Sequence, residues 1–222
     1  MRNWREGWCR VPALFLLFFW VTGAARAVPV WRTVPPGQAP TTYQQWMFDD
    51  ADNPAVPEIS YNTYCTASAQ ITLGGATHGR QPGWYNSWWG RQGVWVSNET
   101  TVTLTIPDSP IANTYKEVWV EMVFWGELLP DTGITNPAHG VTKLAETLEY
   151  TTDAWRIWNV GWRIEPNPAE ETIFIHMLNS GAIVDYITVD TLCVPEPTTI
   201  CLLGLGGLAL LYRKRQDIRL AA

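Results

Sequence analysis

The chain contains few of the residues on which most reactive sites depend. It has four cysteines and three histidines among 222 residues, and it has no Cys-x-x-Cys or Cys/His spacing of the kind that holds zinc. His78, His139 and His176 are far apart in the sequence, and no serine or cysteine near them has a nucleophile-elbow pattern. The sequence therefore gives no indication of a zinc site or of a hydrolase triad.

Positive charge is scarce in the central part of the chain, residues 28–194. Seven basic and eighteen acidic residues leave this segment with a net charge of −11. Because phosphate groups are bound by Lys and Arg, this charge disfavours a nucleic acid as partner. The segment is long enough for one domain with a substantial core. Helix signals are scarce too, and only residues 143–148 have the pattern of a turn or two of helix.

Long apolar runs occur only near the two ends of the chain. Near the N-terminus, an apolar run over residues 11–21 precedes Ala25-Arg26-Ala27, which fits the small-x-small pattern of a cleavage site. The basic residues around the start of this run are Arg2, Arg5 and Arg10. The arrangement predicts a signal peptide over residues 1–27 and a mature chain that starts at Val28, with a proline-rich lead-in over residues 28–40.

The C-terminus combines a short polar motif, an apolar segment and a basic stop. Val194-Pro195-Glu196-Pro197 is followed by an uncharged segment, residues 198–212, and then by Arg213-Lys214-Arg215. The apolar segment is shorter than the roughly 20 residues of a full spanning helix, and the basic cluster would be held on the cytoplasmic side of a membrane. On hydropathy alone, this arrangement could also be an ordinary C-terminal anchor.

The order of these parts, with Pro-Glu-Pro ahead of the apolar segment, resembles the PEP-CTERM sorting tail of bacterial envelope proteins. The resemblance implies that the protein is exported, that residues 198–212 hold it transiently in the inner membrane, and that an exosortase-type enzyme recognises the motif and removes the tail. It further implies a location in the cell envelope, at the outer surface or in the extracellular matrix. The tail, residues 194–222, is a targeting signal. It says nothing about the chemistry of the preceding domain.

The segment between the two ends has the pattern of an all-β domain, which we expect to span residues 41–193. In residues 101–106 threonines alternate with Val102, Leu104 and Ile106, so the apolar side chains share one face of a strand. Similar patterns predict strands over residues 61–73, 94–97, 117–125, 155–165, 172–178 and 182–192. Asn179-Ser180-Gly181 predicts a hairpin between the last two. Strands at this spacing indicate a two-sheet antiparallel β-sandwich that is jelly-roll-like.

The last predicted strand contains Asp-Tyr-Ile-Thr-Val-Asp at residues 185–190. This run resembles the closing strand of jelly-roll modules related to carbohydrate-binding modules, in which an apolar strand with Asp residues lies near the first strand. The resemblance is confined to the end of the domain. It implies a fold, and it assigns no ligand-binding residue.

An aromatic segment, residues 83–92, is the first candidate site. Three tryptophans and a tyrosine lie there among Gly, Asn and Ser without the alternation of a strand, which indicates a loop. Flat aromatic faces can stack on the C–H face of a sugar ring while amide and guanidinium groups bond its hydroxyls, and loops on a sandwich often carry such sites. The candidate carbohydrate-binding residues are Trp84, Tyr85, Trp88, Trp89 and Arg91. The alternative is a lid whose rings pack on the sheet.

A cluster of acidic residues, Asp49, Asp50 and Asp52, is a second candidate. Carboxylate oxygens in a turn are the ligands that Ca²⁺ prefers. The spacing differs from that of an EF-hand loop, however, and Asp is an ordinary turn residue. Calcium is therefore the only cofactor for which the sequence offers a candidate site.

Glu117 and Glu121 form a third candidate, because they lie on the same side of a predicted strand. They faintly resemble the paired glutamates of laminarinase-like glycoside hydrolases, which have Asp where this chain has Trp119. Residues i and i+4 of a regular strand lie about 13 Å apart, which is farther than the roughly 5–9.5 Å between the carboxyl groups of glycosidases. Two solvated carboxylates are the alternative.

Cys65 and Cys193 are the cysteines that remain when the predicted signal peptide and tail are set aside. In an oxidising space they could form a disulfide that joins an early strand to the last one. The closed loop is long, and such a loop contributes ~4–5 kcal/mol in the chain-entropy treatment. Since the sequence does not give the Cα separation, two separate buried thiols are an equal alternative.

Together these features predict an exported, non-catalytic protein of the cell surface or extracellular matrix. The expected partners are an exosortase-type enzyme, the membrane through the tail, and a polysaccharide bound by the aromatic segment. A purely structural envelope component without a ligand is an alternative of the same class. A glycan-cleaving enzyme that uses Glu117 and Glu121 is the alternative from a different class.

Overall fold

The computed structural model describes residues 41–108, 115–126, 128–135, 140–151, 153–178 and 181–194. The predicted signal peptide, the proline-rich lead-in and the tail beyond Val194 lie outside these residues. The described part consists of twelve strands and contains no helix. The strands are β1 (Thr41–Trp46), β2 (Ile59–Tyr61), β3 (Ser68–Gly74), β4 (Gly83–Trp88), β5 (Arg91–Val96), β6 (Glu99–Pro107), β7 (Tyr115–Trp125), β8 (Asp131–Thr135), β9 (Gly140–Tyr150), β10 (Arg156–Glu165), β11 (Glu170–Met177) and β12 (Ile183–Val194).

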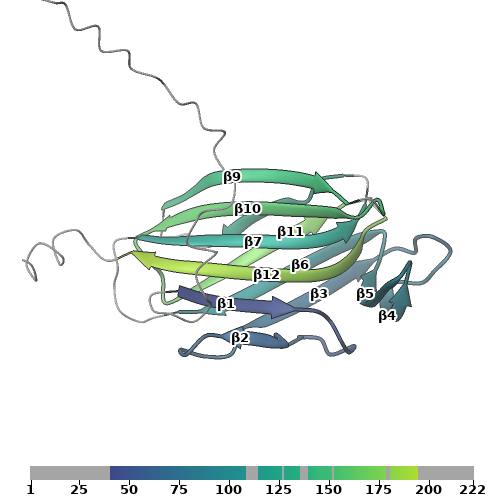
Figure 1. Ribbon diagram of the computed structural model, residues 1–222, viewed down its shortest axis with the longest axis horizontal. Helices are drawn as coiled ribbons and strands as arrows, with labels where there is room; N and C mark the ends of the chain where they lie inside the picture. The colour runs from purple at the N-terminus through teal and green to yellow at the C-terminus, as the bar shows by residue number, and fades with distance from the viewer. Residues whose placement is uncertain are drawn as a thin grey trace, which may run out of the picture.

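The strands form two antiparallel sheets that pack face to face (Figure 1). The larger sheet has the order β2-β1-β12-β7-β10-β9, and the β4–β5 hairpin joins it through pairing of β5 with β12. The smaller sheet has the order β3-β6-β11-β8 and lies behind the larger one in Figure 1. The predicted all-β, two-sheet antiparallel sandwich is therefore confirmed. No helix among the described residues has the length and apolar character needed to cross a membrane.

The core lies between the sheets and follows the alternation of the sequence. In β6 the side chains of Val102, Leu104 and Ile106 are fully buried, as predicted, and the threonines between them are half-buried. The same alternation in the larger sheet buries two further sets, Val118, Val120, Met122 and Phe124 of β7, and Trp158, Val160, Trp162 and Ile164 of β10. Burial of these apolar side chains is the main term that stabilises the sandwich.

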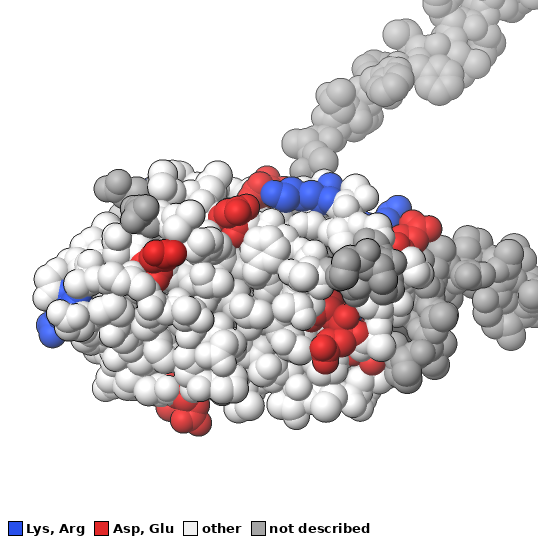
Figure 2. Space-filling model, turned by 180° about the vertical axis from the view of Figure 1, so that it is seen from behind, with Lys and Arg blue, Asp and Glu red and all other residues white. Residues whose placement is uncertain are grey.

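The outer face of the smaller sheet is a largely uncharged surface. Thr101, Thr103 and Thr105 of β6 alternate with the core residues, and β11 places Thr172 opposite Thr105. Figure 2, which shows the molecule from this side, has charged side chains only in scattered groups. The acidic charge of the domain is therefore not gathered on this sheet.

Three expectations about individual elements are wrong. The hairpin predicted at Asn179-Ser180-Gly181 does not form, because β11 pairs with β6 and β8 in one sheet whereas β12 pairs with β1, β5 and β7 in the other. The helical turn predicted over residues 143–148 is part of β9, where pairing with β10 overrides local preference. The strand predicted over residues 61–73 is divided between β2 and β3.

Candidate binding site at the β4–β5 hairpin

The aromatic segment predicted as a loop is the β4–β5 hairpin. Its two-residue turn consists of Trp89, with φ of 44°, and Gly90, with φ of 79°. Positive φ at both positions is typical of a type I′ turn, whose twist matches that of paired strands. The loop prediction is wrong because the flanking residues do not alternate between apolar and polar. Gly90 was the one signal for a tight turn.

The hairpin is fixed to the core by its inner side. Trp84 lies opposite Trp95 in the ladder, and its Nε1 donates a hydrogen bond to the carbonyl oxygen of Phe48 over 2.8 Å. Gly93 has φ of 67°, and a Cβ atom there would lie 2.2 Å from that same oxygen. Only glycine allows so close a backbone approach. The hairpin is therefore a firmly positioned platform.

The tip of the hairpin carries an exposed tryptophan in a cluster of aromatic rings. Trp89 has 53 % of its surface exposed. Its ring centroid lies 4.8 Å from that of Trp125 at the end of β7, 5.2 Å from that of His78 and 5.7 Å from that of Trp88. His78 is held in turn by a contact of 3.1 Å between its Nε2 and the carbonyl oxygen of Gly181. Three separate segments thus fix the rings around Trp89.

An open pocket of about 270 Å³ lies beside these rings, lined by Arg80, Ser87, Trp88 and Trp89. The guanidinium carbon of Arg80 lies 5.3 Å from the centre of the Trp88 ring and 5.6 Å from that of Tyr85. Within the described part of the chain, the indole Nε1 of Trp88 has no hydrogen-bond partner. The pocket therefore combines apolar ring faces with a guanidinium group and a hydroxyl group.

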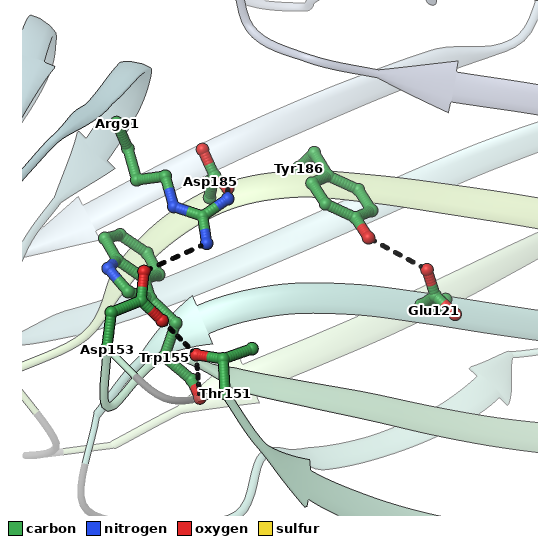
Figure 3. A network of polar contacts seen from close by, with 7 residues as sticks. All are labelled: Arg91, Glu121, Thr151, Asp153, Trp155, Asp185 and Tyr186. Atoms are coloured by element: carbon green, nitrogen blue, oxygen red, sulfur yellow. Dashed lines mark hydrogen bonds and ion pairs between the residues drawn. The ribbon is translucent and has the colours of Figure 1, made fainter.

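Arg91 does not line this pocket, in contrast to its predicted role as a sugar ligand. Its Nη1 lies 3.0 Å from Asp185 Oδ2, its Nη2 lies 3.5 Å from Asp153 Oδ2, and its guanidinium stacks over Trp155 (Figure 3). Burial raises the pKa of Asp185, and the charge of Arg91 opposes that shift. A hydrogen bond from Thr151 lowers the pKa of Asp153. Arg91 therefore links β5 to Asp185 of β12 and to Asp153 in the segment before β10.

The structure thus brings together only part of the predicted aromatic set. Tyr85, Trp88 and Trp89 lie at or near the pocket, whereas Trp84 faces the core and Arg91 joins the ion-pair network. Arg80, His78 and Trp125 were missed by sequence reasoning. His78 and Arg80 belong to a turn joined by the bridge of Thr77 to Arg80, and no sequence pattern indicated that this turn meets the hairpin.

The calcium candidate is not assembled. The side chain of Asp50 accepts a hydrogen bond of 2.9 Å from the backbone N–H of Asp52, as in an ordinary turn. Glu58 accepts bonds from the backbone N–H groups of Met47 and Asp49. Among the residues that the structure describes, no group of three or more His, Cys, Asp or Glu side chains could hold a metal ion. Asp49, Asp50 and Asp52 therefore do not converge on a common point.

Glu117 and Glu121 lie on the same outward side of β7, and each contacts a different side chain. Glu117 lies 3.3 Å from Arg163, and Glu121 accepts a hydrogen bond of 3.0 Å from the hydroxyl of Tyr186 (Figure 3). The register between β7 and β10 is regular throughout, so no bulge on that side shortens the spacing of about 13 Å between the two positions. Burial raises the pKa of Tyr186, and the charge of Glu121 adds to the shift.

The two cysteines are separate thiols in the structure, so the disulfide considered for Cys65 and Cys193 is absent. Cys65 is exposed, contrary to the alternative of two buried thiols, whereas Cys193 is buried. The Sγ atom of Cys193 donates to Asp108 Oδ2 over 3.0 Å. Burial raises the pKa of this thiol, and the charge of Asp108 raises it further.

Comparison with known proteins explains the tail. Residues 194–216 match the PEP-CTERM protein-sorting motif. The chain is therefore an exported protein that an exosortase-type enzyme sorts, and its tail anchors it transiently in the membrane before processing. The predicted basic stop, Arg213-Lys214-Arg215, falls within this match. No match was found among curated proteins or among solved structures. The resemblance of the sandwich to carbohydrate-binding modules stays a prediction.

Proposed function

We propose that the exported domain is a non-catalytic protein of the cell surface or extracellular matrix that binds polysaccharide through the pocket at the β4–β5 hairpin. The observation that carries the proposal is the open pocket of about 270 Å³ lined by Arg80, Ser87, Trp88 and Trp89. Exposed aromatic rings fixed on a rigid hairpin offer a stacking surface for sugar rings without a large cost in side-chain ordering.

The polar groups of the pocket can form hydrogen bonds with the hydroxyl groups of a sugar. Arg80 provides N–H donors in a fixed plane, and the hydroxyl of Ser87 both donates and accepts. Because residues 28–194 carry a net charge of −11, the domain repels polyanions at long range. Neutral polysaccharides are therefore the favoured class.

Native affinity electrophoresis in gels that contain single polysaccharides tests this proposal. The parent protein is expected to be retarded by at least one neutral polymer, and Trp89→Ala is expected to abolish the retardation. Tyr64→Ala is the matched control, because Tyr64 is exposed to 44 % and is not among the residues that line the pocket. Unchanged retardation of Trp89→Ala, or migration of the parent as in a plain gel for every polymer, would overturn the proposal.

The packing of Trp89 also favours a second function, a structural envelope component without a ligand. Its ring contacts both His78 and Trp125, and such contacts stabilise a fold by about 0.5–1.5 kcal/mol each beyond area burial. A structural role predicts that Trp89→Ala lowers the free energy of unfolding while no polymer retards the parent. The binding role predicts loss of retardation in a variant that retains its fold.

A further inference from the structure

A cluster of reactive groups lies at the end of the sandwich opposite the hairpin. The Nζ atom of Lys116 is 2.5 Å from Glu171 Oε2 and 2.8 Å from Asp108 Oδ2, and all three side chains have 0 % exposure. Asp108 Oδ2 also accepts the hydrogen bond from Cys193. A primary amine and two carboxyl groups are thus in contact in a part of the molecule that solvent does not reach.

The topology places the amine on one sheet and the carboxyl groups on the other. Lys116 is the second residue of β7 and lies between Cys193 of β12 and Ile164 of β10 in the larger sheet. Glu171 lies on β11 opposite Ile106 in the smaller sheet. Asp108 follows β6 directly, and its N–H donates to the carbonyl oxygen of Ala169 over 2.8 Å. Any bond between these side chains would therefore join the two sheets.

A simple ion pair accounts poorly for the cluster. Burial costs several kcal/mol per ion, and the attraction between the charges offsets this cost only when the remaining polar atoms are hydrogen-bonded as well. Here Asp108 Oδ1 and Glu171 Oε1 are buried and have no partner in the described part of the chain. One lysine also cannot neutralise two carboxylates. Burial raises the pKa of Glu171 to about 7, despite the opposing effect of Lys116, so about half of the Glu171 side chains carry a proton at pH 7.

We propose that Lys116 and Asp108 condense into an intramolecular amide bond that joins the two sheets, with Glu171 as the group that transfers protons. Lys116 Nζ lies 2.8 Å from Asp108 Oδ2, and this oxygen is bonded directly to the carboxyl carbon that would react. Productive reactions start from separations of about 3–3.5 Å between the reacting atoms. Cys193 and Lys116 both bind the same oxygen of Asp108 and hold that carboxyl in place.

The condensation balances without any co-reactant. Burial lowers the pKa of Lys116, but the charges of Glu171 and Asp108 outweigh this effect and raise it, so the amine must first pass a proton to Asp108. This transfer gives a neutral amine and a neutral carboxyl group without changing the net charge of the cluster. The Nζ lone pair attacks Cγ of Asp108, and the carbonyl oxygen takes the proton of Glu171. Glu171 then removes a proton from the nitrogen and delivers it to a hydroxyl group, which leaves as water with the electrons of the C–O bond. Deprotonation of the remaining oxygen returns Glu171 to its protonated form and leaves a secondary amide.

Glu171 is the better proton carrier of the two acids, and Asp108 is the better site of bond formation. A pKa of about 7 for Glu171 is suited to a group that both donates and accepts protons near neutral pH. Asp108 lies beyond the end of its strand, whereas Glu171 is the second residue of β11 and is paired with Ile106 of β6. A bond from Lys116 to Glu171 is the alternative product, and the experiment below separates the two.

Mass spectrometry of the full chain tests the proposal. The denatured parent is expected to be lighter than its sequence by one water molecule, and trypsin is expected to leave the chain uncut after Lys116. Asp108 and Lys116 would then appear in one looped peptide, residues 92–143, that lacks one water. The parent at full mass with ordinary cleavage after Lys116 would overturn the proposal. A branched peptide that contains Glu171 would overturn the assignment of Asp108.

Variants exclude other sources of water loss. Lys116→Met and Glu171→Gln are expected to have the full mass of their sequences. Loss of water in Lys116→Met would indicate cyclisation of Asp108 onto its own backbone and would overturn the proposal. Lys143 is the internal control, because it lies 3.1 Å from Glu146 at the surface. Trypsin is expected to cut after Lys143, and water loss there would show that dehydration does not depend on the buried site. These readouts do not depend on glycan binding.

Discussion

The two ends of β7 differ in whether their polar and reactive groups are open to solvent. At one end, Trp125 packs against Trp89 and His78 beside a pocket that opens to solvent. At the other end, Lys116 meets Asp108 and Glu171 where all three side chains are fully buried. The groups at the hairpin end are available to a ligand from outside. The groups at the Lys116 end are available only to one another.

The difference arises from what covers each end of the larger sheet. The Lys116 end is closed by the smaller sheet, since Glu171 and Asp108 come from β11 and the end of β6. The hairpin end is covered by β4 and β5, which belong to the larger sheet itself and end in the exposed ring of Trp89. Substitutions at the first end should therefore act on the stability of the sandwich alone, and those at the second should also act on binding.

The largest expected effect is that of Lys116→Met. It removes the nitrogen that contacts both Asp108 and Glu171, and loss of one partner from a buried polar pair costs about 3–5 kcal/mol. We expect a fall of this size in the free energy of unfolding, measured by urea denaturation. The matched variant Lys143→Met removes an exposed pair and should cost no more than about 1 kcal/mol. Equal effects of the two variants would contradict a special role for the buried cluster.

Gly93→Ala should displace the β4–β5 hairpin from the core without changing any aromatic residue. A Cβ atom at this position would lie 2.2 Å from the carbonyl oxygen of Phe48, and overpacking against a fixed backbone costs about 1–3 kcal/mol. We expect lower stability together with weaker retardation in polysaccharide gels. Gly79→Ala is the control, because Gly79 has a φ of 73° but nothing within 4 Å. A similar loss of stability in both variants would show that the effect comes from the positive φ alone and not from the contact with Phe48.

The Lys116 end should also make stability depend on pH. Glu171 has a pKa near 7 in the folded protein against an ordinary value of 4.5. Between these values the folded state binds more protons than the unfolded state, so the free energy of unfolding falls as pH rises, by at most about 1.4 kcal/mol per pH unit. Urea denaturation at several pH values measures this slope. Glu171→Gln should flatten it, and an unchanged slope would assign the dependence to other groups.

The two ends of β7 differ in how far their structure could be predicted from the sequence. Alternation predicted the fold class and the buried faces, and it also carried a signal for the buried cluster. Lys116 has the same parity as Val118 and Val120 in β7, and Glu171 has that of Ile173 in β11, so each charge stands on an apolar face. The hairpin pocket could not be predicted fully, since no sequence pattern shows that the turn with Arg80, which lines the pocket, and His78, which packs against Trp89, lies beside the hairpin.

The middle of β7 provides the smallest expected effect and separates binding from catalysis. Glu121→Gln retains an oxygen that can accept the hydrogen bond from Tyr186, so the free energy of unfolding should change by less than about 0.5 kcal/mol, as for ordinary surface substitutions. Retardation by polysaccharide should also be unchanged, because Glu121 does not line the pocket. Release of reducing ends from a polysaccharide by the parent, lost in Glu121→Gln, would contradict this result. The function would then lie on β7 between the two ends, with Glu121 as a catalytic residue.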